Sequence, residues 1–133
     1  MNTSKQTLKK ILYAEDQESI QRIACIALEK LGGYEVKACD NGKEALEAVV
    51  DFQPDLLLLD VMMPEMDGPQ ALCAIRSLEP FKSIPVIFIT AKVLPDEIDS
   101  LMGLGAYSVI PKPFDPTTLA REIQDIWDEY HGG

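Results

Sequence analysis

The sequence predicts an α/β protein built on a doubly wound, five-stranded parallel sheet. Strand-like segments alternate with helix-like segments along all 133 residues, and this alternation implies right-handed crossovers with helices on both faces of the sheet. The run Leu56–Leu59 consists of leucine alone, which is typical of a strand buried on both faces. The length suits one domain and no linker or repeat interrupts the chain, so 1–133 is predicted to be a single domain with a folded body at about 9–130.

The first strand is expected at about Lys10–Ala14, an apolar run that stops at an acidic pair. A helix is predicted over Glu18–Leu31, because apolar residues recur there at helical spacing and Gly32-Gly33 is typical of the position just past a helix end. The residues expected on the apolar stripe of this helix are Ile20, Ile23, Ala24, Ala27, Leu28 and Leu31.

Tyr34–Cys39 has a mixed pattern that favours a second strand at an edge of the sheet. Asn41 and Glu44 form a capping-box pattern, which predicts a helix from there through Val50. A proline then breaks the chain before the third strand, Leu56–Leu59.

Asp67 is predicted to cap a third helix that runs to about Leu78, with Pro69 in its first turn and Gln70 at the box position. After a loop, the short apolar run Val86–Ile89 is the expected fourth strand.

Pro95 is expected to start a short fourth helix, and Tyr107–Ile110 is the predicted fifth strand. Asp115-Pro116 is expected to open the last helix. The inward residues predicted for these two helices are Ile98, Leu101 and Met102 in the first, and Leu119, Ile123, Ile126, Trp127 and Tyr130 in the second.

Composition excludes several classes of protein. Lys and Arg total 12 against 22 Asp and Glu, a net charge of −10 that repels nucleic-acid phosphates, so direct nucleic-acid binding is not expected. The 3 cysteines are widely spaced and odd in number, which argues against a disulfide framework or a zinc site and fits a reducing compartment. There is no signal-peptide pattern and no apolar run near the ~20 residues that span a bilayer, so a cytoplasmic protein without membrane insertion is expected.

Polar side chains follow four of the predicted strands. Glu15 and Asp16 follow the first, Asp60 the third, Thr90 the fourth and Lys112 the fifth. Because the carboxyl ends of parallel strands meet at one edge of the sheet, these groups are expected to converge. Clustered carboxylates repel one another, and a hard divalent cation such as Mg²⁺ removes that penalty. Asp60 would then act as a nucleophile that forms an aspartyl phosphate, while Lys112 and Thr90 bind the phosphoryl oxygens.

The chain resembles the receiver domain of two-component response regulators from Ile11 to about Trp127. The matching marks are the Glu15-Asp16 pair, the segment Leu59-Asp60-Val61-Met62-Met63-Pro64-Glu65-Met66-Asp67-Gly68, Thr90-Ala91 and Lys112-Pro113-Phe114. The Asp60 segment is the most specific of these, and the acidic pair and Thr90 would be weak evidence without it.

The resemblance implies a flavodoxin-like sheet in the order 2-1-3-4-5, flanked by five helices. It implies that Asp60 is the phosphoacceptor, phosphorylated by a sensor histidine kinase or a phosphotransfer protein. Mg²⁺ would be held directly by Asp16 and Asp60, through water by Glu15, and by the backbone carbonyl of Met62. No other cofactor is implied. The resemblance also implies a cis peptide bond before Pro113.

One position departs from the family pattern. The family usually has an aromatic residue, which changes rotamer on phosphorylation, three positions before the lysine. Here that position is Val109, whose side chain is stiff and short. Tyr107 lies two residues earlier and is expected on the same face of the strand. Whether Tyr107 replaces the missing aromatic stays open.

The implied function is a switch whose partner-binding surface, near 96–102, 107–109 and 116–127, changes when Asp60 is phosphorylated. The only chemistry expected is self-phosphorylation from a donor and slow autodephosphorylation, with Met62 and Lys92 beside the path of the attacking water. The alternative is a receiver-like interaction module that works without phosphorylation. A phosphohydrolase is disfavoured because Met62 stands where such enzymes carry a second acid. A flavodoxin is disfavoured because the first strand is followed by no glycine- or hydroxyl-rich phosphate loop, and because the Glu15-Asp16 pair would repel a flavin phosphate.

Several properties are not determined by the sequence. These are the cognate kinase, the downstream effector and pathway, whether the chain is a stand-alone protein or an excised part of a larger regulator, and whether it forms a homodimer.

Overall fold

A computed structural model describes residues 7–131. Its centre is one parallel sheet in the order β2-β1-β3-β4-β5, which confirms the predicted fold. The strands are β1 (Lys10–Ala14), β2 (Glu35–Cys39), β3 (Leu56–Asp60), β4 (Val86–Thr90) and β5 (Ser108–Pro111). Every residue of β3 and β4 is buried, as expected for central strands covered on both faces.

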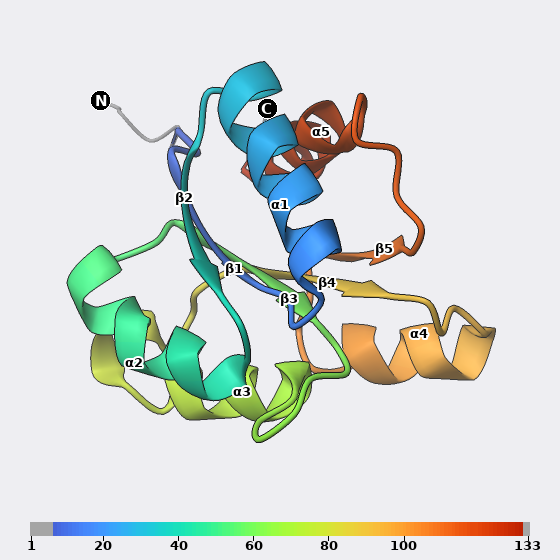
Figure 1. Cartoon of the computed structure of the whole chain (residues 1–133). Coiled ribbons are helices and arrows are strands. Elements are labelled where there is room, and N and C mark those ends of the chain that lie inside the picture. Colours follow the sequence, from blue (N-terminus) through green and yellow to red (C-terminus); the bar gives the residue numbers. More distant parts are fainter. Residues whose placement is uncertain (1–6, 132–133) are drawn as a thin grey trace.

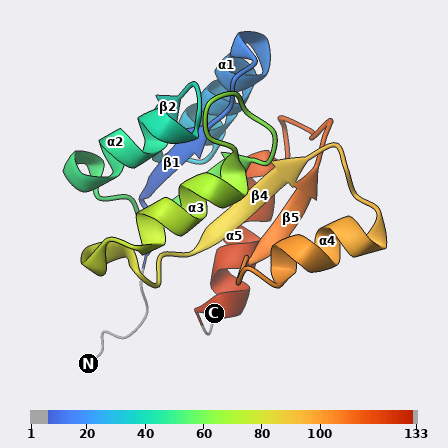
Figure 2. The same cartoon turned by 90° about the horizontal axis from the view of Figure 1, so that it is seen from below.

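Helices cover both faces of the sheet (Figures 1 and 2). α1 and α5 lie on one face, and α2, α3 and α4 lie on the other. Their bounds are α1 (Glu18–Ile26, continued by a π-helical turn, Ala27–Leu31), α2 (Gly42–Phe52), α3 (Gly68–Arg76), α4 (Pro95–Met102) and α5 (Leu119–Tyr130). No helix in the described part of the chain is both long and apolar enough to span a bilayer.

Each face of the sheet has its own apolar core. On the α1–α5 side, Tyr13, Leu58 and Ile89 pack with the buried residues of those two helices, including Trp127. On the other side, Leu59 and its neighbours pack under α2, α3 and α4. Alternate residues of one strand point to opposite faces, so the continuous leucine run of β3 supplies both cores.

Two helix caps follow the sequence closely. Asp67 and Gln70 form the predicted capping box, with each side chain accepting from the other residue's backbone N–H at 2.8 and 3.0 Å. Asn41 caps α2 by accepting from the Glu44 N–H at 2.9 Å. The Glu44 carboxylate does not complete that box, because it accepts from the N–H of Asp40 instead.

The stripe predicted for the first helix is wrong in part. Ala24, Ala27 and Leu28 are buried, but Ile23 is 48% exposed and Leu31 64% exposed. The helix therefore keeps an apolar flank that residues 7–131 leave exposed.

The start of the last helix was also predicted too early. Asp115-Pro116 forms a turn in which the Asp115 carboxylate accepts from the N–H and the hydroxyl of Thr117, and α5 begins only at Leu119. Tyr130, predicted to face inward, is 49% exposed.

Tyr107 and Val109 do not share a face of the sheet, contrary to the expectation. Tyr107 precedes β5 and stacks on Tyr130 of α5 with ring centroids 4.3 Å apart, and its hydroxyl lies 2.9 Å from Nε2 of His131. Val109 packs against the opposite core, under α2, α3 and α4. Tyr107 is therefore held against α5 and does not occupy the place of the missing aromatic residue.

Candidate functional site

The residues singled out in the sequence meet at the carboxyl edge of the sheet. Glu15 comes directly after β1, Asp60 and Thr90 are the last residues of β3 and β4, and Lys112 comes directly after β5. One carboxylate oxygen from each of Glu15, Asp16 and Asp60 lies within 4.8 Å of the others. Two strands, β1 and β3, thus bring together acids separated by up to 45 residues, which is the convergence that the strand-end pattern predicted.

Lys112 joins two of the three acids. Its Nζ lies 2.8 Å from Oδ2 of Asp60 and 2.8 Å from Oε1 of Glu15. The Glu15 side chain is fully buried, the Asp60 side chain is 6% exposed and the Lys112 side chain 15% exposed. The ammonium group is thus the internal counter-charge that lets two carboxylates lie side by side away from water.

Burial dominates the ionisation of Glu15. Removal from water raises the pKa of its carboxyl, while the hydrogen bonds from Lys112 and from the Gln17 N–H oppose that rise. For Lys112, burial alone would lower the pKa, but hydrogen bonds to Asp60 and Glu15 outweigh it and the pKa is raised. Lys112 therefore stays charged at neutral pH.

The open side of the site is a hollow of about 370 Å³. Asp16 stands exposed at its rim. Thr90 is 2% exposed, and its Oγ1 accepts from the N–H of Lys92 at 3.0 Å. The N–H of Met62 donates to Oδ1 of Asp60 at 3.3 Å. The residues that line the hollow are Asp16, Gln17, Ile20, Asp60, Met62, Thr90, Ala91, Lys92 and Lys112.

The loop that follows Asp60 is fixed by close backbone contacts. The Gly68 N–H donates to the Val61 carbonyl at 3.0 Å. A Cβ atom on Gly68 would lie 2.5 Å from the Asp60 carbonyl oxygen, so this position requires glycine. The Asp67 cap and Gly68 together return the chain against the end of β3, which holds the Asp60 backbone in place.

Lys112 is oriented in a similar way by its neighbours. Its N–H donates to the Thr90 carbonyl at 2.9 Å, which extends the pairing of β5 with β4 by one residue. The Lys112–Pro113 bond is cis, as predicted. After Pro113 the chain turns away towards α1.

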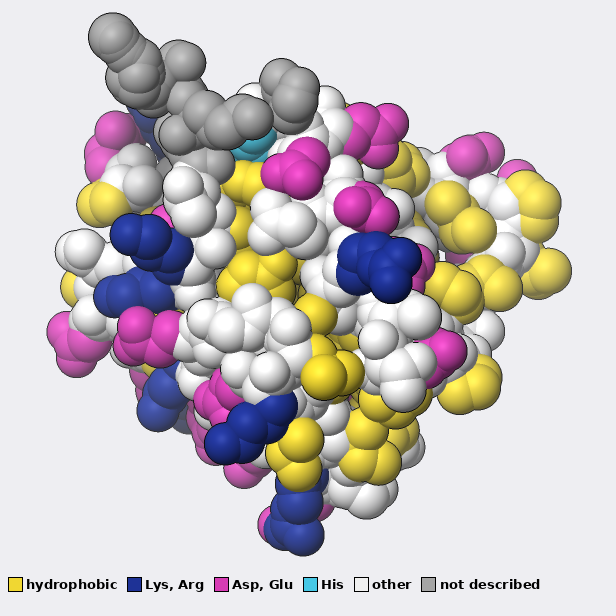
Figure 3. All heavy atoms as spheres, turned by 90° about the horizontal axis from the view of Figure 1, so that it is seen from above, with side chains coloured by type: hydrophobic (Ala, Val, Ile, Leu, Met, Phe, Trp, Pro, Cys, Tyr) yellow, Lys and Arg dark blue, Asp and Glu magenta, His cyan; other side chains and the backbone are white. Residues whose placement is uncertain are grey.

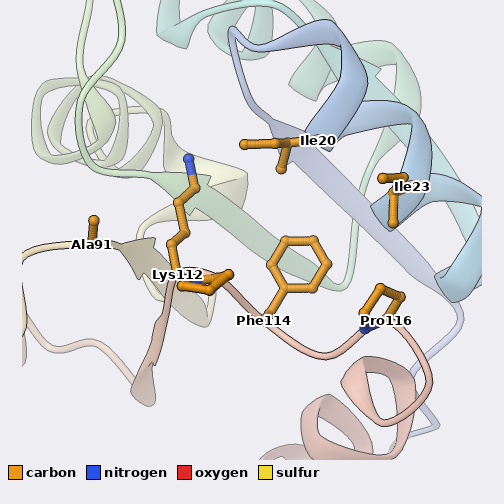
Figure 4. Close-up of a pocket in the computed structure, with 7 residues that line it drawn as sticks. Ile20, Ile23, Ala91, Lys112, Phe114 and Pro116 are labelled. Atoms are coloured by element: carbon orange, nitrogen blue, oxygen red, sulfur yellow. The ribbon is translucent and has the colours of Figure 1, made fainter.

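An apolar groove adjoins the acidic hollow and shares Ile20, Ala91 and Lys112 with it. In Figure 4, Ile20 and Ile23 project from α1, and Phe114 and Pro116 lie opposite them on the connection from β5 to α5. Figure 3 looks onto the α1–α5 side of the molecule, where apolar side chains are exposed among charged side chains of both signs.

Sequence reasoning did not identify two glutamines at this edge. The Gln17 N–H donates to Oε2 of Glu15 at 3.1 Å, and the Gln21 side chain binds two backbone carbonyls beside the acids. The sequence also does not predict the contact between Lys112 and Glu15, because it indicates only that Lys112 binds a phosphoryl oxygen. Proximity to the acidic pair was the one available signal for the glutamines, and no pattern in the sequence indicates their partners.

Comparison with known proteins agrees with this geometry. Residues 11–124 match the family model described as the response regulator receiver domain. The chain is 36% identical over 117 residues to the regulatory protein AtoC of Escherichia coli, covering 88% of this chain and 25% of that protein. It is 36% identical over 120 residues to PhoP of Bacillus subtilis, the alkaline phosphatase synthesis transcriptional regulatory protein, covering 89% of this chain and 48% of that protein. The chain thus spans half or less of the length of these two relatives.

Solved structures give a fuller match in length. The chemotaxis response regulator CheY4 of Vibrio cholerae superimposes with a TM-score of 0.82 at 31% identity, over 90% of this chain and 99% of that one. A CheY-like receiver domain protein from Methanospirillum hungatei superimposes with a TM-score of 0.80 at 28% identity, over 95% of this chain and 98% of that one.

Proposed function

The chain belongs to the response regulator receiver domain family, the phosphoacceptor domains of two-component signalling, and from this premise we propose that it is a switch phosphorylated on Asp60. The observation that carries the proposal is the position of the Asp60 carboxylate. It ends a central strand, lies among two further acids and makes a 2.8 Å contact with Lys112. One domain spanning 1–133, with its folded body at about 9–130, is part of the proposal, supported by the single sheet.

The acids also fit a magnesium ion. Receiver domains generally bind Mg²⁺ at an acidic cluster, and three carboxylates within 4.8 Å form the hard oxygen donor set that this ion prefers. Asp16 and Asp60 would hold the ion directly, Glu15 would hold its bound water, and the Met62 carbonyl would supply a further oxygen. When bound, the ion offsets the negative charge that the incoming phosphoryl group brings to the site.

The chemistry of the protein's own residues is simple. An Asp60 carboxylate oxygen attacks the phosphorus of the donor, the bond from phosphorus to the donor's nitrogen or oxygen breaks, and the donor leaves with that electron pair. Lys112 Nζ then exchanges its contact with Asp60 Oδ2 for a phosphoryl oxygen. The Thr90 hydroxyl, which accepts from the Lys92 N–H in the unphosphorylated form, turns to donate to another phosphoryl oxygen.

Loss of the phosphoryl group is proposed to be slow hydrolysis without a protein base. The residue two positions after Asp60 is Met62, which transfers no proton. Catalysis by this chain is therefore limited to its own phosphorylation and dephosphorylation.

We place the phosphodonor protein, a sensor histidine kinase or phosphotransfer protein, on the apolar groove. The groove shares Ile20, Ala91 and Lys112 with the acidic hollow, so a protein that delivers a phosphoryl group to Asp60 has to lie across this rim. The exposed flank of Ile23, with 48% of its surface accessible, would then be covered by the donor. A cytoplasmic location belongs to the same proposal and is supported by the three free cysteines.

The output surface is proposed to comprise α4, β5 and α5, which all follow Thr90 in the chain, with Lys112 between β5 and α5. The chemistry of the site does not select a downstream effector or favour a homodimer. It also gives no support to a module that works without phosphorylation, because every acid, the hydroxyl and the lysine are present.

The site assignment is tested by trapping the acyl phosphate. The protein is phosphorylated with a small-molecule donor and Mg²⁺, reduced with borohydride and digested, which converts a phosphorylated aspartate into homoserine. We expect homoserine at position 60 alone. Homoserine at Asp16, or none at any position in a protein shown to gain a phosphoryl group, would contradict the assignment.

A further inference from the structure

The side chain of Gln21 links the two strand ends from which the acidic pair emerges. Its Nε2 lies 2.8 Å from the Glu15 carbonyl oxygen, 3.1 Å from the Cys39 carbonyl oxygen and 3.1 Å from Oδ1 of Asp40. The first acceptor follows β1, the second ends β2, and the third begins the connection to α2. One amide group on α1 therefore holds three segments together at the edge of the proposed metal site.

These contacts belong to a network that fixes the Glu15 backbone on both sides. The Glu15 N–H donates to the Cys39 carbonyl at 3.0 Å, and the same carbonyl accepts from Gln21. On the other side, the Gln21 N–H donates to the Gln17 carbonyl at 2.9 Å, which anchors the start of α1. The peptide between Glu15 and Asp16 is thus held from β2 and from the helix at once.

The Asp16 side chain has no such support of its own. Within residues 7–131 it makes no hydrogen bond or ion pair, and it is exposed at the rim of the hollow. Its position relative to Asp60 is therefore set by the backbone that carries it. The Gln21 side chain makes a hydrogen bond directly to that backbone, at the Glu15 carbonyl.

We propose that Gln21 is a positioning residue for magnesium, which holds the Glu15-Asp16 backbone in the conformation that brings Asp16 to the same ion as Asp60. The amide group donates hydrogen bonds without carrying charge, so it orders the acids without repelling a cation from them. This inference rests on the proposed magnesium site and assigns Gln21 no contact with the ion or with the phosphoryl group.

The expected loss of Mg²⁺ affinity follows from what residues behind the metal ligands contribute to metal binding in other proteins. Removing a group that orients a ligand typically weakens metal affinity about 10- to 100-fold. Gln21 acts on the backbone next to a ligand, so the lower end, about tenfold, is expected.

The test compares Gln21→Leu with Gln124→Leu in the full chain. Leucine fills a similar volume but donates nothing. Gln124 is the matched control, because it is a helical glutamine whose Oε1 accepts from the Tyr34 hydroxyl and whose Nε2 donates to Asp128, but it lies on α5 away from the acids. Mg²⁺ affinity is measured by isothermal titration calorimetry, and the free energy of unfolding by urea denaturation in EDTA. If Gln21→Leu folds poorly, Gln21→Met, an unbranched residue that also donates no hydrogen bond, replaces it.

The inference predicts that Gln21→Leu weakens Mg²⁺ binding about tenfold, while Gln124→Leu binds Mg²⁺ like the wild type, whatever stability either variant loses. Equal Mg²⁺ affinity in Gln21→Leu and Gln124→Leu would overturn the positioning role and leave the proposed function untouched. Absence of Mg²⁺ binding in the wild type would instead overturn the metal site itself, and the inference with it.

Discussion

At the scale of single residues, Lys112 is the group that makes this site stable before phosphorylation. Its ammonium lies 2.8 Å from carboxylate oxygens of both Glu15 and Asp60. Both acids are almost wholly removed from water, so their mutual repulsion would be strong without a cation between them. The residue proposed to bind the phosphoryl group is thus the same residue that stabilises the unphosphorylated site.

Replacing Lys112 by methionine is expected to lower the free energy of unfolding by about 3 kcal/mol in EDTA, because removing one partner of a buried ion pair leaves the other unpaired. The loss should shrink when Mg²⁺ is added, since the ion supplies the missing positive charge.

The loss of stability in Lys112→Met should also shrink as pH falls below neutral. Burial raises the Glu15 pKa above its unfolded value, so the folded protein takes up the proton first and stability is regained on acidification. Urea denaturation in EDTA and in Mg²⁺ measures the first effect, and urea denaturation in EDTA at neutral and at lower pH measures the second.

Lys82→Met is the control for this experiment. Lys82 pairs with Glu79 at 3.8 Å, but both side chains are more than two-thirds exposed. Exposed pairs contribute about 0–1 kcal/mol, so little change is expected. A Lys112→Met variant as stable in EDTA as Lys82→Met would show that the acids need no internal counter-charge.

Met62 and Lys92 are expected to set the lifetime of the phosphorylated form. Both line the hollow over Asp60, and Met62 is 58% exposed there, on the side open to water. Met62→Asn replaces an apolar group with one that hydrogen-bonds an attacking water, and Lys92→Ala widens its path. Each variant should change the rate of phosphate loss several-fold, followed by the decay of phosphoprotein on denaturing gels. Lifetimes identical to the wild type in both variants would rule out this path for water.

The three cysteines should differ in reactivity. Burial raises the pKa of Cys39 to about 11 and also raises that of Cys25, whereas Cys73 is exposed. A raised pKa means less thiolate at a given pH, so Cys39 should resist a thiol reagent in the native protein at pH 8. Cys73 should react first and all three cysteines after denaturation, counted by mass. Fast labelling of Cys39 in the native state would contradict its burial.

At the scale of elements, the caps do more than start helices. The capping box of Asp67 and Gln70 begins α3 just where the loop from Asp60 returns to the sheet. Gly68, beside the cap, lies so close to the Asp60 carbonyl that no side chain fits. The start of α3 is therefore part of what positions Asp60.

Asp67→Ala is expected to cost about 1 kcal/mol of stability through loss of the N-cap. Asp51→Ala is the matched control, because Asp51 lies exposed on α2 and should change stability by less than about 0.5 kcal/mol. Urea denaturation compares the two. Equal stability of both variants would mean that the box seen here does not stabilise α3.

The elements also show what the sequence determines by itself. β1 has the predicted bounds, Lys10–Ala14, because an apolar run between polar residues defines a strand locally. The capping box that Asp67 forms is likewise determined by residues close together in the sequence. The exposed apolar flank of α1 is not, because the exposure of Ile23 depends on how far the β5–α5 connection reaches over the helix. The same holds for α5, where the turn at Asp115 delays the helix.

Contacts between distant segments account for what the sequence missed at the site. Strand ends predicted which residues converge, but not which of them touch. Lys112 was expected to await a phosphate, and its contact with Glu15 joins residues 97 positions apart. The role of Gln21 likewise depends on the meeting of β1 with β2. Such contacts follow from strand order and register, which local patterns do not specify.

At the scale of the whole molecule, phosphorylation is expected to act through the loops after β4 and β5. It adds about −1.5 to −2 charges at Asp60, which draws Lys112 and Thr90 towards the phosphoryl group. Those two loops lead into α4 and α5. Differential contacts of a few kcal/mol suffice to shift a two-state equilibrium between surfaces.

We expect the route of this change to differ from an aromatic rotamer switch. Val109 is stiff and Tyr107 is held by its stack on Tyr130 and its hydrogen bond to His131, so neither side chain is free to swing into the space beside Thr90. The β4–α4 loop, which carries exposed Val93 and Leu94, is the more direct connection from Thr90 to the surface.

The measurement that tests the central claim most directly is the intact mass of the protein after incubation with acetyl phosphate and Mg²⁺, with Asp60→Ala treated in parallel. The account predicts one added phosphoryl group on the wild type, none on Asp60→Ala, and none on the wild type when EDTA replaces Mg²⁺. An unmodified wild type with confirmed Mg²⁺ binding, or equal modification of Asp60→Ala, would contradict the claim that this chain is a switch phosphorylated on Asp60.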